Sequence, residues 1–235
     1  MKTSVLLATL ASATMAFGQF SFDQPYQIGY AANLNVGDSV VNMTNSGVQG
    51  GFASLSSHGN ICVNVYTFDP QEEEIACCSC VVTPNALVSL SVRNDLISNL
   101  LTPSVPNSVV IKLVASEPGL DPTKRYTLCN PSTVGGTNPL FANVPYDSPG
   151  DPGPGSLTIG LRAWGSTLEP AAGGAYAPVG VGFLTAAFLN NTTMGTAFTE
   201  ELTQLASTCQ FIQANGSGYG TCKTCRLGAL SGSRN

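Results

Sequence analysis

Residues 61–80 read ICVNVYTFDPQEEEIACCSC and contain the clearest structural pattern in the chain. Apolar residues alternate with other residues over 61–66, and this period of two is typical of a β-strand with one face on a core. A turn is predicted next, at 69–72, because Pro70 fixes a backbone dihedral angle that suits a turn. The stretch therefore predicts a β-hairpin, and its second strand contains three closely spaced cysteines.

The same period of two recurs farther along the chain. The segments are 88–93, 109–114 and 157–164, and residues 175–189 add one or two further strands. Short strands at about ten-residue spacing are typical of a sandwich or barrel. Residues 200–214 have helical periodicity instead, and Thr199 is placed to cap the first turn. The prediction is a mainly β fold, an antiparallel β-sandwich with one C-terminal α-helix, stapled by disulfides.

Proline and glycine recur from residue 116 to residue 156, and the segment ends in PGDPGPG at 149–155. Regular secondary structure does not continue through such a segment, because proline lacks a backbone donor and glycine favours turns. The segment is either a long ordered loop or a linker, so it is a candidate sub-boundary. Cysteines lie on both sides of it, and we therefore predict a single β-sandwich domain over 19–235.

Residues 1–18 have the three-part pattern of a secretory signal peptide. The start is basic, 4–16 are mostly small and apolar, and Ala16-Phe17-Gly18 has small residues at the positions that a signal peptidase reads. The apolar run is too short to span a bilayer. We expect cleavage after Gly18 and export to the extracellular space, the cell surface or the periplasm. A buried N-terminal helix is the alternative.

The chain contains eight cysteines, and an exported protein folds in an oxidising compartment. They are Cys62, Cys77, Cys78, Cys80, Cys129, Cys209, Cys222 and Cys225. Disulfides are therefore the expected state, although the sequence selects no pairing. On a strand, Cys78 and Cys80 point to one face and Cys77 to the other. We predict that these cysteines tie the sheet to distant segments of the chain.

Two alternatives use the same sulfurs as thiolates. Four thiolates bind zinc tetrahedrally, and Cys78, Cys80, Cys222 and Cys225 are the candidate set, although Cys-x-Cys is an unusual half-site. Cys222 and Cys225 are also spaced like a redox pair, but that chemistry needs a following helix, and no helix-forming segment follows. We therefore predict structural disulfides, no metal site and no cofactor.

Charged residues make up 10% of the chain, well below the usual share, and the formal net charge is −5. Lys and Arg form no dense group, which argues against nucleic acids and anionic membranes as partners, because both are bound through clustered positive charge. No apolar stretch after residue 18 predicts a membrane span, since the best one, at 174–189, is interrupted by Gly and Pro.

No catalytic set is visible in the sequence. His58 is the only histidine and lies in a polar loop, so a Ser-His or Cys-His hydrolase is not predicted. Asp69 and Glu72–Glu74 offer oxygen ligands for calcium, but EF-hand spacing is absent and a solvated turn is favoured. A glycosidase needs two facing carboxylates, and nothing selects a pair. Trp164, the sole tryptophan, is interpreted as a core anchor rather than as a surface for stacking on carbohydrate.

Two zones of the sequence resemble an uncharacterised group of exported bacterial proteins of the acidobacterial kind. The first zone is NICVNVYTFDPQEEEIACCSC at 60–80 with TPNALVSLSV at 83–92, and the second is NGSGYGTCKTCR at 215–226. The resemblance is weak in the Pro/Gly-rich middle. It implies a bacterial exported protein and no particular activity, since no function is assigned to the group.

The predicted function rests on the disulfide-stapled β scaffold and the missing catalytic set. We expect an exported, non-catalytic structural or interaction protein of the cell surface or extracellular space, which self-associates or binds a cell-surface partner. A module that binds glycans or another ligand is one alternative. A secreted hydrolase that uses paired carboxylates is the other.

Overall fold

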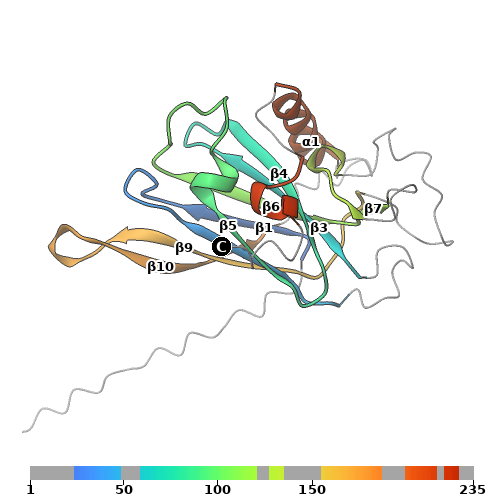
Figure 1. Cartoon of the computed structure of the whole chain (residues 1–235), viewed down its shortest axis with the longest axis horizontal. Coiled ribbons are helices and arrows are strands. Elements are labelled where there is room, and N and C mark those ends of the chain that lie inside the picture. Colours follow the sequence, from blue (N-terminus) through green and yellow to red (C-terminus); the bar gives the residue numbers. More distant parts are fainter. Residues whose placement is uncertain are drawn as a thin grey trace, which may run out of the picture.

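The computed structural model describes residues 24–48, 59–120, 127–134, 155–186, 199–215 and 220–227. Two antiparallel sheets pack face to face, and the helix α1 (Thr199–Ala214) lies against the outer face of the larger sheet (Figure 1). The predicted mainly β fold with a helix near the C-terminus is confirmed. The predicted signal peptide and His58 lie outside the described residues.

The larger sheet, sheet A, has five strands, and the smaller one, sheet B, has four. In spatial order, sheet A contains β11 (Leu184–Thr185), β1 (Tyr26–Ala31), β6 (Val109–Ser116), β3 (Ile61–Phe68) and β4 (Glu74–Val82). Sheet B contains β10 (Tyr176–Gly182), β9 (Leu161–Pro170), β2 (Val40–Asn45) and β5 (Leu87–Ser91). A small ribbon and four short helical segments are also described: β7 (Gly119–Leu120), β8 (Thr127–Leu128), η1 (Val92–Leu96), η2 (Pro131–Thr133), η3 (Ala172–Gly174) and η4 (Lys223–Leu227).

The main core lies between the two sheets. Val63 and Val65 of β3 point into it from sheet A, and Met43 of β2 and Leu90 of β5 point into it from sheet B. All four side chains are fully buried, and each contributes about 1.5–3 kcal/mol through removal of apolar surface from water. The period of two in the sequence therefore identifies the inner faces of these strands.

A second cluster fills the space between sheet A and α1. The predicted apolar face of the helix is the buried face, and it consists of Leu202, Leu205, Cys209 and Ile212. These residues pack with Tyr66 of β3 and Val114 of β6 on the outer side of the sheet. The alternation in β3 predicts that one face of the strand is exposed to solvent. This expectation is wrong, because the cluster between sheet A and α1 covers that face. Within β3, Phe68 alone is not buried.

Two strand boundaries differ from the predicted ones. The segment predicted to begin at 157 begins as a strand at Leu161, and the strand after Leu87 ends at Ser91, where η1 begins. The Ser91 hydroxyl accepts a hydrogen bond from the Asn94 backbone N–H and caps that turn. Within the Pro/Gly-rich segment 116–156, the described residues contain only β7, β8 and η2 as complete elements.

All eight cysteines form disulfides, as predicted. The pairs are Cys62–Cys129, Cys77–Cys209, Cys78–Cys222 and Cys80–Cys225. Cys78 and Cys80 lie in the core between the sheets, whereas Cys77 lies on the opposite face of β4 with α1. Cys222 and Cys225 are each disulfide-bonded to a cysteine of β4, so they are neither the free thiolates that the zinc alternative requires nor a redox pair with each other.

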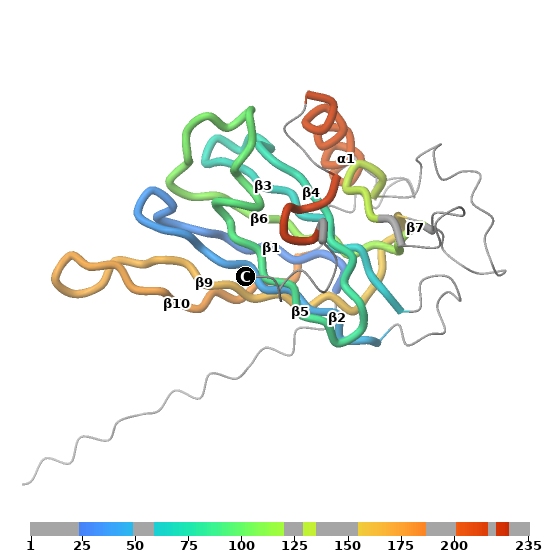
Figure 2. The backbone as a smooth tube through the Cα atoms, viewed as in Figure 1, coloured from blue at the N-terminus to red at the C-terminus, as the bar shows by residue number. Residues whose placement is uncertain are grey.

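The hairpin of β9 and β10 extends beyond the rest of the two sheets (Figure 2). After β10 the chain crosses through Phe183 and pairs as β11 with β1, so consecutive residues join the edges of sheets B and A. Among the described residues, no helix has the length and apolar character needed to cross a membrane.

Candidate functional site

A groove of about 790 Å³ lies between α1 and the outer surface of sheet A, next to the turn that joins β3 and β4. Three large apolar side chains in its lining are substantially exposed, namely Leu101, Val110 and Phe211, and Phe211 is 65% exposed. Apolar surface of this kind in a concave site is typical of ligand-binding sites. The groove is therefore the candidate ligand-binding site in the described part of the chain.

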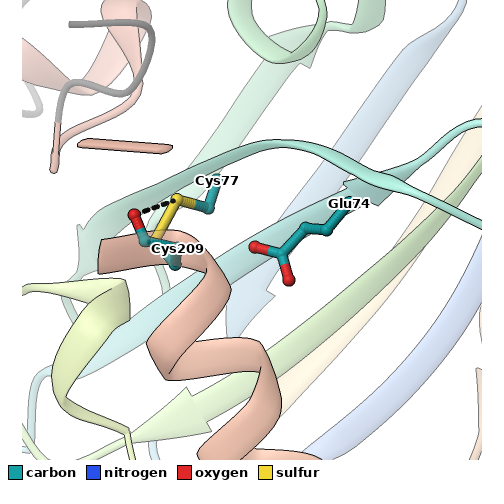
Figure 3. Close-up of side chains that lie close together, drawn as sticks. All are labelled: Glu74, Cys77 and Cys209. Carbon is teal, nitrogen blue, oxygen red and sulfur yellow. Dashed lines mark hydrogen bonds between the residues drawn. A yellow bond between two sulfur atoms is a disulfide. The ribbon is translucent and has the colours of Figure 1, made fainter. Parts of the chain in front are cut away.

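The helix wall of the groove is held by a disulfide. Cys77, in the middle of β4, is bonded to Cys209 of α1, and Leu205 and Ile212 pack on either side of Cys209 along the same helix face. Figure 3 shows this disulfide beside Glu74, which lies at the start of β4. Because the bond joins the two walls covalently, the groove is a fixed feature of the fold.

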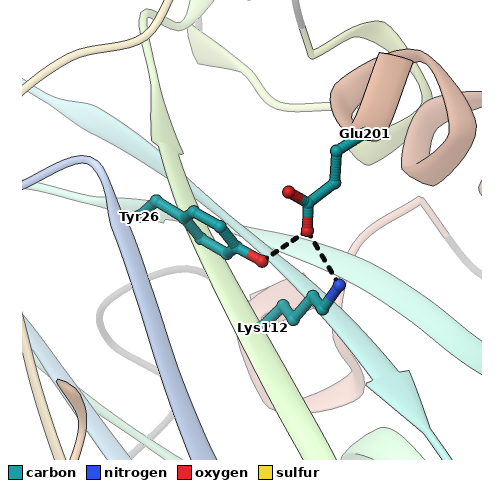
Figure 4. Close-up of polar contacts among 3 residues, drawn as sticks. All are labelled: Tyr26, Lys112 and Glu201. Carbon is teal, nitrogen blue, oxygen red and sulfur yellow. Dashed lines mark hydrogen bonds and ion pairs between the residues drawn. The ribbon is translucent and has the colours of Figure 1, made fainter. Parts of the chain in front are cut away.

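A second link joins α1 to the sheet through polar groups (Figure 4). The Tyr26 hydroxyl of β1 donates a hydrogen bond of 2.7 Å to Glu201 Oε1, and Lys112 Nζ of β6 lies 2.8 Å from the same oxygen. Lys112 Nζ also lies 4.8 Å from the centre of the Phe68 ring, within cation–π range. Burial raises the pKa of Tyr26, and the hydrogen bond to Glu201 and its negative charge raise it further, so the phenol remains a donor.

Glu74 is the least satisfied polar group in the groove. Its Oε1 atom is buried and has no hydrogen-bond partner among the described residues. Burial raises the pKa of Glu74 to about 8, and the positive charge of Lys112 offsets only part of this effect. The carboxyl group is therefore mostly protonated at neutral pH, and it offers an incoming ligand both a hydrogen-bond donor and an acceptor.

We expect Glu74→Gln to stabilise the protein at pH 8 by on the order of 2 kcal/mol, since one pKa unit corresponds to about 1.4 kcal/mol and partial exposure reduces the effect. In the folded state the group titrates near 8 instead of 4.5, so the folded protein binds the proton more tightly than the unfolded chain. Wild-type stability should therefore fall as the pH rises from about 4.5 to about 8, and the variant should lose this dependence.

Urea unfolding of both proteins between pH 4 and pH 9 measures this difference, with Glu73→Gln as the matched control. Glu73 lies in the same turn and is exposed, so its replacement should leave the pH profile unchanged. Parallel profiles for the wild type and Glu74→Gln would contradict the assigned pKa.

The acidic turn forms the rim of the groove. Asp69 Oδ1 accepts hydrogen bonds from the backbone N–H groups of Gln71 and Glu73, at 2.9 and 3.0 Å, so this carboxylate stabilises the predicted turn. Glu72 and Glu73 are exposed, as expected for a solvated turn. Besides the protonated Glu74, four carboxyl groups line the groove, against the single amino group of Lys112. Its electrostatic character therefore favours positively charged ligands.

One group of potential metal ligands is found among the described residues. Glu74 Oε, Cys77 Sγ and Cys209 Sγ lie within 4.8 Å of one another (Figure 3). The two sulfurs form a disulfide and are not thiolates, so they are not metal ligands. The donor set reduces to one protonated carboxyl group, which does not fit a metal ion.

The structure brings together residues that the sequence did not connect. Tyr26, Lys112 and Glu201 meet although Tyr26 and Glu201 are 175 positions apart, and no local pattern predicts such a contact. The sequence predicts the acidic turn at 72–74, but it does not predict that this turn lies beside α1. Trp164 was interpreted as a core residue, and this is wrong, because it is 43% exposed on sheet B, away from the groove.

Glu201 Oε1 accepts a hydrogen bond from Tyr26 and pairs with Lys112, so this carboxylate oxygen is engaged in holding α1 to sheet A. Comparison of the chain with family models, with curated proteins and with solved structures finds no match.

Proposed function

We propose that this is an exported interaction protein whose groove binds a cationic, partly apolar peptide segment of a partner at the cell surface or in the extracellular space. Four disulfides in one small fold support an oxidising compartment. The observation that carries the proposal is the combination, in one groove, of exposed apolar side chains and a carboxylate-rich rim.

The groove matches such a segment on two counts. Phe211 and Leu101 offer apolar surface that a partner side chain would cover, and aromatic residues of this kind are frequent energetic centres of interfaces. Glu72 and Glu73 at the rim would pair with Lys or Arg side chains of the segment, which speeds encounter more than it strengthens the final complex. The unpartnered Glu74 oxygen would accept a hydrogen bond from the bound segment.

A labelled twelve-residue peptide of alternating Leu and Lys tests the proposal by fluorescence anisotropy. We expect the wild type to bind it, and Phe211→Ala to weaken binding about tenfold, which corresponds to about 1.4 kcal/mol. Raising the salt from 50 mM to 500 mM should weaken binding as well, because the rim charges are exposed.

Two controls keep the result specific to the groove. Leu87→Ala removes an equally exposed apolar side chain on the far side of the molecule, on sheet B, and should leave binding unchanged. The same peptide with Glu in place of Lys should not bind. Equal binding of both peptides, or an unaltered affinity for Phe211→Ala, would refute the groove as the binding site.

A further inference from the structure

The outer face of sheet B presents Trp164 in a row of small polar residues and glycine. Val41 and Met43 of β2 point into the core, so alternation places Asn42 on the outer face. Asn42 is directly opposite Ser89 of β5 on one side and Trp164 of β9 on the other, and Trp164 is opposite Gly182 of β10. The row across the four strands is therefore Ser89, Asn42, Trp164 and Gly182.

The indole ring is not used to cover its neighbours. An aromatic residue opposite glycine often packs over it and shields the strand. Here no atom lies within 4 Å of the position that a Cβ would take at Gly182 or at Gly180, so Trp164 does not pack over either glycine. Trp164 is 43% exposed, and the space above Gly180 and Gly182 of β10 is open.

Hydrogen-bonding groups lie on the other side of the ring. Ser89 Oγ donates to Asn42 Oδ1 at 2.7 Å, which fixes the orientation of the amide. Asn42 Nδ2 then remains as a donor with no acceptor among the described residues. This side of Trp164 therefore presents an oriented, half-buried amide donor on the residue directly opposite it in β2.

The charges of this face select the class of ligand. Among the outward positions on β5, β2, β9 and β10, Arg162 alone is charged. The uncharged outward residues are Val40, Asn42, Thr44, Leu87, Ser89, Ser91, Trp164, Ser166, Leu168, Pro170, Tyr176, Pro178, Gly180 and Gly182. One positive charge is too little for a nucleic acid. Asp38 is the acidic group that contacts these positions, and its carboxylate already accepts from the Ser91 hydroxyl and the Arg93 backbone N–H, so it offers little to a cation. An exposed aromatic ring beside neutral hydrogen-bonding groups suits a ligand with an apolar face and polar edges.

We propose that the outer face of sheet B binds a neutral carbohydrate chain, with one sugar ring stacked on Trp164 and its hydroxyl groups hydrogen-bonded to Asn42. Sugar rings have this chemistry, because C–H groups form one face and hydroxyl groups surround it. Tyr176 lies on the same face at the far end of β9 and β10, about 20 Å away at roughly 3.3 Å per residue, so the chain of sugars would run along the hairpin. The site is separate from the groove, and the proposal does not depend on the proposed function.

The test uses the full disulfide-bonded protein and a panel of hexasaccharides of β-1,4-linked glucose, N-acetylglucosamine, mannose and xylose, with affinity measured by calorimetry. We expect at least one to bind with a Kd below about 1 mM, and Trp164→Ala to weaken that binding at least tenfold. Trp164→Tyr should retain most of the affinity, because it keeps an aromatic face. Asn42→Ala should weaken binding by a smaller factor.

A blocking variant separates ligand binding from folding. Gly182→Leu places a side chain into the open space beside the ring and should abolish binding while the circular dichroism spectrum remains that of the wild type. Phe211→Ala, which alters the groove, should leave carbohydrate binding unchanged. The proposal is overturned if no hexasaccharide binds, or if Trp164→Ala binds as the wild type does.

Discussion

Replacing both Cys77 and Cys209 with alanine is expected to lower the free energy of unfolding by about 3–5 kcal/mol and to loosen α1. The disulfide closes a loop of 132 residues, so its loss restores much conformational freedom to the unfolded chain. The helix then keeps the packing of its apolar face, a hydrogen bond from Gln213 Nε2 to Asn130 Oδ1, and the partly exposed link from Glu201 to Lys112 and Tyr26, which contributes little. Urea unfolding and amide hydrogen exchange of α1 measure the two effects.

The matched control is the double replacement of Cys80 and Cys225. This disulfide closes a loop of 145 residues and joins β4 to η4, not to α1. Loss of this disulfide should lower the free energy of unfolding by a similar amount, because the entropic effect grows only slowly with loop length. Protection of the α1 amides from exchange should then fall only as far as the global stability falls. If the helix amides of the Cys77 and Cys209 double variant exchange no faster than those of the control, α1 is not held by the disulfide.

Gly165→Ala is expected to destabilise the fold by about 3 kcal/mol or more, because it forces two strands apart. A Cβ at this position would lie 2.6 Å from the backbone oxygen of Val40, and that oxygen belongs to β2, the neighbouring strand. A flexible side chain would move away, whereas a backbone carbonyl moves only with its strand. The measurement is the midpoint of thermal or urea unfolding.

Alanine substitutions at two other glycines serve as comparisons for Gly165→Ala. At Gly29 the added Cβ would lie 2.6 Å from the Phe183 ring, which can move only by disturbing the packing of the core. Gly29→Ala should therefore lower stability by an amount between those of Gly165→Ala and Gly182→Ala. At Gly182 nothing lies within 4 Å, and Gly182→Ala should change stability by less than about 0.5 kcal/mol. The clash at Val40 would be contradicted by equal stability of Gly165→Ala and Gly182→Ala.

The sequence predicted those elements whose pattern is local. The period of two located β3 and β6, helical spacing located α1, and the cysteine positions on β4 were assigned to the correct faces. β1 and β2 were not predicted, because polar residues occupy buried positions in both. Gln27 Nε2 donates to the backbone oxygen of Leu161, and Asn45 Nδ2 donates to the backbone oxygens of Gly59 and Val82, so these polar residues are buried without breaking the fold.

The groove could not be predicted from the sequence, for a different reason. Its walls come from segments that are far apart in the chain and are joined by the disulfide between Cys77 and Cys209. Eight cysteines allow many pairings, and only the three-dimensional arrangement of the sheets selects one. The acidic run at 72–74 predicts a turn. That this turn lines the same groove as Glu201 and Lys112 depends on where α1 packs on sheet A.

The order of the cysteine pairs has a consequence for biosynthesis. The first four cysteines along the chain pair with the last four in the same order, so no native bridge closes within either half. As a nascent chain emerges N-terminus first, Cys62, Cys77, Cys78 and Cys80 are all present before Cys129, the earliest native partner. Any bond formed among the early thiols is a mispairing that must be undone by thiol–disulfide exchange. Maturation of this protein therefore depends on an isomerase, or on early thiols that stay reduced until translation is nearly complete.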